Sequence, residues 1–180
     1  MSKILDSPNP LIFSIDPSGM GTSGIWVCYN NNSNFTARKM TEIEADNPYD
    51  AVTQIMEYIE KIQSECGSIE YFAVEECYIP KAHQSDKNKQ VPLQVRKTIE
   101  LIGMLKILFG SKYVGLQPDW KDKEEYKAIK NDKYRWQNFK KSEHIVDAYL
   151  LCERMKKTIR KNLTYYDLRG NLRGGKNGNN

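Results

Sequence analysis

Apolar residues follow two different periods along this chain. Short apolar runs predict five strands, at residues 11–16, 25–29, 35–40, 69–75 and 113–116. Segments with apolar residues three or four apart predict three helices, at residues 48–64, 93–109 and 143–163. This order predicts an α/β fold with one mixed five-stranded sheet. An antiparallel meander would join parallel strands, with helices on both faces and the first and fourth strands side by side.

Residues that favour helix ends support these boundaries. Asn47 followed by Pro48 is typical of a helix start, and Ser142 stands before the last helix. Gly67 and Gly110 follow the first two helices, where glycine commonly ends a helix. The segment 121–141 is charged and only weakly helical in its pattern.

Charge is distributed unevenly along the 180 residues. The chain has a net charge of +4, but residues 154–180 carry eight basic residues and one acidic residue, or +7, so the rest carries −3. A basic arm on a mildly acidic body indicates a polyanionic partner, although a solubilising tail would look the same. We expect one folded domain over residues 1–163 and a flexible tail, rich in glycine and asparagine, over 164–180.

Targeting and membrane signals are weak. No apolar run reaches the roughly 18 residues that a membrane span needs. The first residues lack the apolar centre of a signal peptide. We therefore expect a cytoplasmic protein that does not contact a membrane.

One glycine motif invites a cofactor interpretation. Gly19, Gly21 and Gly24 match the G-x-G-x-x-G pattern of dinucleotide-binding proteins, and Glu42 or Glu44 lies near the expected position of a ribose-binding acid. That pattern must open a helix whose N-terminus faces the pyrophosphate. The residues after the motif, 25–29, favour a strand instead. The glycines therefore favour a hairpin turn, and we expect no nucleotide cofactor.

Acidic residues follow two strands that the predicted sheet places side by side. Asp16 ends the first strand and Glu75 ends the fourth, with Glu76 directly after it. His144 and Asp147 are three residues apart, so they share one face of the last helix. Such groups would repel one another unless a cation binds, and Mg²⁺ prefers oxygen ligands. Each acid taken alone could equally be an ordinary turn, strand-end or helix-surface charge.

The chemistry of such a cluster is phosphodiester hydrolysis. Two Mg²⁺ ions about 3.5–4 Å apart can clamp the attacking and leaving oxygens of a phosphodiester. A basic arm would bind the nucleic-acid backbone. The residues therefore predict a metal-dependent nuclease.

The chain resembles the RuvC-type Holliday-junction resolvases, nucleases of the RNase H-like fold. It looks most like their phage or small-genome branch. The resemblance covers roughly residues 11–154 and rests on three motifs: the strand that ends in Asp16-Pro-Ser, the strand Tyr71-Phe-Ala-Val-Glu75, and His144-Ile-Val-Asp147. It implies that Asp16, Glu75, His144 and Asp147 are catalytic and bind the metal, with Glu75 selected over Glu76 because it directly follows Phe-Ala-Val.

The same resemblance implies partners and further contacts. Tyr78 matches an aromatic residue near the junction centre, although it could equally pack under the loop, and Lys121 matches a lysine that contacts phosphate. We also expect Lys81 and Lys123 to contact DNA. The resemblance implies two Mg²⁺ ions per site, for which Mn²⁺ can substitute. It also implies branched DNA as substrate and a homodimer, because paired nicks need two sites.

Two departures from the family pattern leave the substrate range open. A charged segment, 123–136, replaces the glycine-containing basic loop after the fifth strand, and the basic tail is additional. The substrate could be strictly the four-way junction or branched DNA more broadly. The alternatives are another RNase H-like nuclease, such as a DNA-packaging terminase nuclease, and a non-catalytic protein that binds branched DNA. A sugar-kinase or actin-like ATPase fits least, because those proteins repeat the fold in two lobes.

Overall fold

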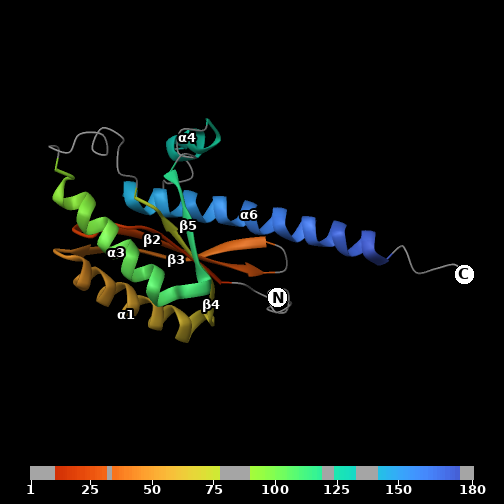
Figure 1. The fold of residues 1–180 in the computed structure, drawn as a ribbon, viewed down its shortest axis with the longest axis horizontal. Coiled ribbons are helices and arrows are strands. Elements are labelled where there is room, and N and C mark those ends of the chain that lie inside the picture. The colour runs from red at the N-terminus through yellow and green to blue at the C-terminus, as the bar shows by residue number, and fades with distance from the viewer. Residues whose placement is uncertain (1–10, 32–33, 78–89, 119–123, 133–141, 175–180) are drawn as a thin grey trace, which may run out of the picture.

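A computed structural model describes residues 11–31, 34–77, 90–118, 124–132 and 142–174 (Figure 1). The strands are β1 (Leu11–Asp16), β2 (Gly21–Asn31), β3 (Asn34–Ala45), β4 (Ile69–Glu75) and β5 (Tyr113–Leu116). The helices are α1 (Pro48–Cys66), α3 (Leu93–Phe109), the 3-10 turn η1 (Gly110–Lys112), α4 (Glu124–Asn131) and α6 (Glu143–Gly174).

The strands form one mixed five-stranded sheet in the order β3-β2-β1-β4-β5. β1 is antiparallel to β2 and parallel to β4, with Ile15 opposite Val74. β2 pairs with β3 in antiparallel fashion, and β4 pairs with β5 in parallel fashion. The sheet confirms the predicted α/β fold and the predicted neighbourhood of the first and fourth strands.

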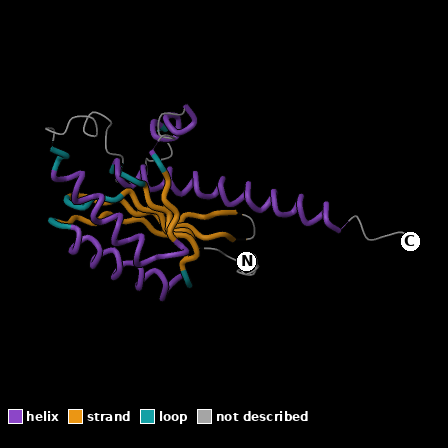
Figure 2. Tube along the Cα trace, viewed as in Figure 1, coloured by secondary structure: helices purple, strands orange, loops and turns teal. Residues whose placement is uncertain are grey.

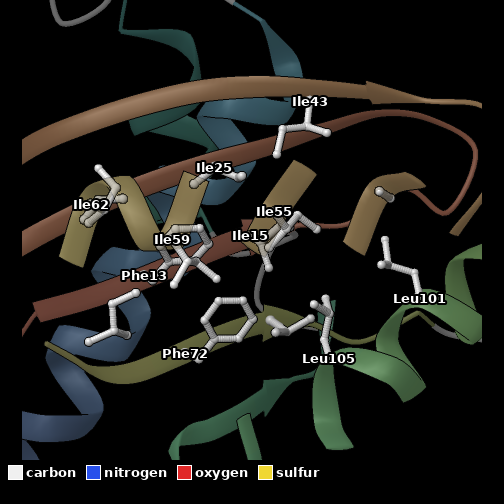
Figure 3. Close-up of a cluster of buried hydrophobic side chains, with 14 of the residues drawn as sticks. Phe13, Ile15, Ile25, Ile43, Ile55, Ile59, Ile62, Phe72, Leu101 and Leu105 are labelled. Atoms are coloured by element: carbon white, nitrogen blue, oxygen red, sulfur yellow. The ribbon is translucent and has the colours of Figure 1, made fainter. Parts of the chain in front are cut away.

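Two layers cover the sheet, one on each face. α1 and α3 lie on one face and α6 crosses the other (Figure 1). Under α1 and α3 the core is mainly apolar, and Phe72 stacks between Phe13, at 4.9 Å, and Phe109, at 3.7 Å between ring centroids. Figure 3 shows the side chains of this cluster converging between the helices and the strands. A second cluster, which includes Ile12, Ala73 and the apolar side of α6, fills the opposite face.

The meander is longer than the sequence predicted. β2 begins at Gly21 rather than near residue 25, and β3 continues to Ala45 rather than ending near residue 40. Glu42 therefore lies inside a strand, where it pairs with Gly24. The glycine motif opens a strand and no helix, so the dinucleotide-binding alternative lacks the geometry that it requires.

The last helix is also longer than predicted. α6 ends at Gly174, whereas the sequence predicted an end near residue 163 (Figure 2). Gly170 lies inside the helix, where glycine costs about 1 kcal/mol relative to alanine but does not by itself end a helix. Neither this helix nor any other helix in the described segments combines the length and apolar character needed to cross a membrane. Residues 175–180 lie outside the described residues.

Candidate active site

The ends of β1 and β4 bring two acids to one edge of the sheet. Ile15 lies beside Val74, and both side chains pack in the core under α1 and α3. Successive residues of a strand point to opposite faces, so Asp16 and Glu75 both face α6. Each residue is partly buried, and the Oε2 atom of Glu75 is buried completely. The backbone therefore places Asp16 and Glu75 side by side, as the sequence predicted.

The first turn of α6 adds an imidazole. His144 Nδ1 lies 3.0 Å from Asp16 Oδ2. A carboxylate accepts hydrogen bonds, so we assign the Nδ1–H of His144 as the donor. In the neutral form of this tautomer, Nε2 carries the lone pair and can accept a proton or a metal ion. The side chain of His144 is 46% exposed, so part of it is open to solvent.

Asp16 also controls the protonation of His144. The hydrogen bond with Asp16 raises the pKa of His144 above its ordinary value of 6.5, against the lowering effect of partial burial. The charges of Asp16, Glu42 and Asp147 raise this pKa further. The imidazole is therefore a better proton acceptor here than a histidine in water.

Asp147 lies one turn further along α6 and has its own cationic partner. Its Oδ1 is 3.4 Å from Nζ of Lys130, which belongs to α4. The Asp147 side chain is only 13% exposed.

A buried hydroxyl helps hold this turn of α6 against the sheet. Ser14 Oγ lies 2.9 Å from the carbonyl oxygens of Ala148 and Trp26, and its hydroxyl can donate to either of them. Ala148 directly follows Asp147, so this contact fixes the backbone beside the acid. Strands β1 and β4 and the first turns of α6 thus bring the four predicted residues to one edge and one face of the sheet.

Glycines make the close approach of the helices possible. A Cβ on Gly24 would overlap the backbone of His144, so the first turn of α6 rests directly on β2. A Cβ on Gly19 would likewise overlap the backbone of α3 at Lys97. The N–H of Gly19 also donates to Thr98 Oγ1 at 3.2 Å. Gly19 and Gly24, whose spacing matches a dinucleotide-binding loop, therefore allow α3 and α6 to pack closely against the chain.

Glu76 follows Glu75 but has a different role. Its carboxylate accepts a hydrogen bond from Gln117 Nε2 at 2.6 Å and lies 3.5 Å from Lys106 Nζ of α3. A Cβ on Gly115 would overlap this carboxylate, so the glycine gives it room to cross β5. Burial raises the pKa of the neighbouring Tyr113, and Glu76 raises it further, to about 12. The carboxylate of Glu76 is engaged in a network between β5 and α3.

Two residues near the site were not among the predicted site residues. Glu42 pairs with Gly24 across the meander and helps to raise the pKa of His144, so its charge acts at the site. The antiparallel register would have revealed it, had the full length of β2 and β3 been predicted. No pattern in the sequence marks Lys130 as a site residue, because its contact with Asp147 depends on how α4 packs against α6.

The chemistry of the four predicted ligands suits a divalent metal. The three carboxylates supply the oxygen ligands that Mg²⁺ and Mn²⁺ prefer. Within the segments that the structure describes, however, no three His, Cys, Asp or Glu side chains form a group ready to hold a metal ion. Three of the four are engaged in these contacts: Asp16 and His144 with each other, and Asp147 with Lys130. We conclude that the donor set fits the metal and that its side chains must adjust to bind it.

The expected DNA contacts cannot be placed in the same way. Tyr78, Lys81, Lys121 and Lys123 all lie outside the described residues. Their roles therefore stay predictions.

Comparison with known proteins supports the fold. No protein-family model matches the sequence, and no curated protein matches it. The structure is similar to RuvC of Thermus thermophilus, with a TM-score of 0.50, 15% identity, and coverage of 81% of this chain and 96% of RuvC. It is similar to the yeast mitochondrial Holliday junction resolvase Ydc2, with a TM-score of 0.51, 12% identity, and coverage of 86% of this chain and 83% of Ydc2.

The chain has an RNase H-like fold of the RuvC type. At these low identities the likeness shows the fold alone. The expected relation to the phage branch stays a prediction, since the two similar structures come from a bacterium and from yeast mitochondria.

Proposed function

We propose that this protein is a structure-selective endonuclease that cleaves Holliday junctions or other branched DNA by metal-dependent hydrolysis of a phosphodiester. One observation carries the proposal: the fold gathers Asp16, Glu75, His144 and Asp147 at one edge and one face of an RNase H-like sheet, with Asp16 hydrogen-bonded to His144. The likeness to RuvC and to the resolvase Ydc2 adds support at the level of fold.

The carboxylates would hold the metal. Asp16 stands between Glu75 on the neighbouring strand and His144 on α6, so we assign Asp16 as the shared ligand. Glu75 and Asp147 would each be a ligand of one ion. Two Mg²⁺ ions, or Mn²⁺ in their place, would stabilise the charge on the attacking and leaving oxygens of the phosphodiester. The chain supplies the fixed positions of the ligands, because three of its elements meet at this edge.

His144 would accept the proton of the attacking water. Its Nδ1–H donates to Asp16, which orients the ring and leaves Nε2 to accept a proton from the attacking water. The hydrogen bond with Asp16 raises the pKa of His144, which makes Nε2 a stronger proton acceptor. If Nε2 ligates the second metal instead, the same hydrogen bond fixes the ring for that role.

We propose that basic and aromatic residues around this edge bind the DNA. Tyr78 would stack on a base at the junction, and Lys81, Lys121 and Lys123 would contact phosphates. Most basic residues of 154–180 belong to α6, which extends well past the sheet (Figure 1). A basic helix of this kind can follow a DNA arm, so we expect binding that weakens as salt rises.

A second copy of the chain is part of the proposal. α3 exposes three large apolar side chains, Leu93 and Leu108 at 51% and Ile107 at 84%. Exposed apolar side chains can contribute to an interface, so we propose α3 as the dimer contact. Sedimentation should show a dimer for the wild type and a monomer for Ile107→Asp, and a wild type that is monomeric at working concentration would contradict the proposed dimer.

The test of the function uses a labelled synthetic four-way junction, a flap and a linear duplex. We expect the wild type to make paired symmetric nicks in the junction with Mg²⁺ but not with Ca²⁺. Asp16→Asn should bind the junction without cutting it, because the substitution removes the charge of the shared ligand. Asp50→Asn is the matched control, since Asp50 lies on α1 across the sheet, and it should cut normally.

Other results would change the proposal in defined ways. Equal cutting of the flap and the duplex would leave a nuclease without preference for branched DNA. Binding without cutting under any metal would make the protein a non-catalytic DNA-binding protein. Full cutting by a folded Asp16→Asn variant would remove the proposed site.

A further inference from the structure

The contact between α4 and α6 places a lysine against an acid of the candidate site. Lys130 Nζ lies 3.4 Å from Asp147 Oδ1, and the Asp147 side chain is only 13% exposed. We propose that Lys130 is an internal counter-ion of Asp147, which a divalent cation must displace in order to bind. This inference rests on the proposed function, because it takes Asp147 as a metal ligand.

The burial of α4 gives Lys130 a defined position. Tyr126, one turn earlier on the same side of α4, is only 3% exposed and packs in the core under α6. Lys157 of α6 lies 5.3 Å from the centre of the Tyr126 ring, which adds a second contact between the two helices. A buried aromatic residue four positions away therefore anchors the turn that carries Lys130. The lysine is held near Asp147 by packing as well as by charge.

The surroundings of Asp147 make this ion pair significant. The Asp147 side chain is 13% exposed and the Lys130 side chain 37%, so water screens the pair less than an ion pair on the surface. α4 offers a comparison, because Lys127 pairs with Glu124 at 3.3 Å with exposures of 50% and 90%. An exposed pair of that kind contributes little. Of these two pairs, only the Lys130 pair occupies an oxygen that the metal would need.

Competition for one carboxylate oxygen has a thermodynamic consequence. A cation that binds Asp147 must break the contact between Asp147 and Lys130, and it must also lie near that positive charge. Both effects weaken metal binding, and both depend on the charge of Lys130. Metal affinity is thus set partly by α4, a segment outside the strands and the helix that carry the proposed ligands.

The experiment is a calorimetric titration of the full chain with Mg²⁺ in the absence of DNA. Lys130→Met removes the charge and keeps much of the side-chain length, and we expect it to bind Mg²⁺ about three- to tenfold more tightly than the wild type. Lys127→Met is the matched control on the same helix and should bind like the wild type. Lys130→Arg restores the charge and should return the affinity to the wild-type value.

The outcomes separate this inference from the proposed function. Asp147→Asn should weaken Mg²⁺ binding, and if it does while Lys130→Met binds no more tightly than the wild type, the counter-ion role is overturned and the metal site stands. If Asp147→Asn binds Mg²⁺ as the wild type does, both the counter-ion role and the proposed metal site are overturned. Circular dichroism would verify folding, and Lys130→Gln serves as a second charge-removing variant.

Discussion

The two faces of the sheet are built from the same strands but carry different chemistry. The face under α1 and α3 is built mainly from aliphatic and aromatic side chains, with the rings of Phe72 and its neighbours stacked at its centre. The face under α6 includes buried polar atoms, among them the hydroxyl of Ser14 and the thiols of Cys28 and Cys152, 2.8 Å apart. It ends in the acids of the candidate site. One face holds the fold together, and the other also positions chemical groups.

The alternation of side chains along β4 determines which of two neighbouring acids lies in the candidate site. Glu75 and Glu76 are neighbours in sequence, yet alternation sends Glu75 toward α6 and the carboxylate of Glu76 to Lys106 and Gln117. A shift of one residue in register would exchange the two acids. The pairing of β4 with β1 therefore decides which carboxylate joins Asp16.

The largest effect we expect comes from replacing Glu75 with its amide. The same replacement at Glu76 is the matched control. Glu75→Gln should lower single-turnover cleavage of a four-way junction about a thousandfold, because a neutral amide stabilises a bound cation poorly. Glu76→Gln should leave cleavage within a few fold of the wild type. It should lower the free energy of unfolding by about 1 kcal/mol or less, since it loses only partly exposed contacts. The reverse pattern of cleavage would show that Glu76 is the site residue.

A glycine pair tests whether α6 must rest on the sheet as closely as it does. Gly24→Ala places a methyl group against the His144 backbone and should lower the free energy of unfolding by about 1–3 kcal/mol, measured with urea. Gly103→Ala is the control, because nothing lies within 4 Å of its Cβ position on α3. It should be neutral or raise the stability by up to about 1 kcal/mol. Equal effects of the two substitutions on stability would contradict the close packing of α6 against β2.

The smallest expected effect is the pH dependence of the His144–Asp16 pair. The pKa of His144 in the folded protein lies above 6.5, so the pair contributes its full stability below about pH 6.5 and loses it as pH rises through the raised pKa. Both side chains are partly solvated, so the contribution should stay below about 1 kcal/mol. His144→Gln should therefore melt roughly 1–3 °C below the wild type at about pH 5.5 and equal it at about pH 9, in EDTA. A gap that widens as pH rises would contradict the assigned interaction.

Much of the fold could be predicted because the sequence pattern is local. The bounds of α3 and the start of α1 after Asn47 follow from periodicity and capping. The side chain of Asn47 accepts hydrogen bonds from the N–H groups of Tyr49 and Asp50, as expected of a helix cap. The neighbourhood of Asp16 and Glu75 follows from the handedness of parallel connections. The extra length of β2 and β3 could not be predicted, because glycines and charged residues hide the strand pattern there.

The site could be predicted only in part for a related reason. The acids stand at the ends of predicted strands and at a helix start, which local signals mark well. Lys130 and Glu42 reach the site through packing between separate elements, and no local pattern in the sequence records such packing. Assigning Glu75 over Glu76 from the sequence needed the family resemblance, and the network around Glu76 supplies an independent physical reason to prefer Glu75.

The most direct test of the central claim is anomalous scattering from crystals of the protein soaked in Mn²⁺. We predict anomalous density in contact with the carboxylates of Asp16, Glu75 and Asp147, with Lys130 moved away from Asp147. Crystals of Asp147→Asn should show weaker density at that place. Density elsewhere, or none at this edge with Lys130 still paired to Asp147 at saturating Mn²⁺, would contradict the claim that this face of the sheet is a metal-dependent active site.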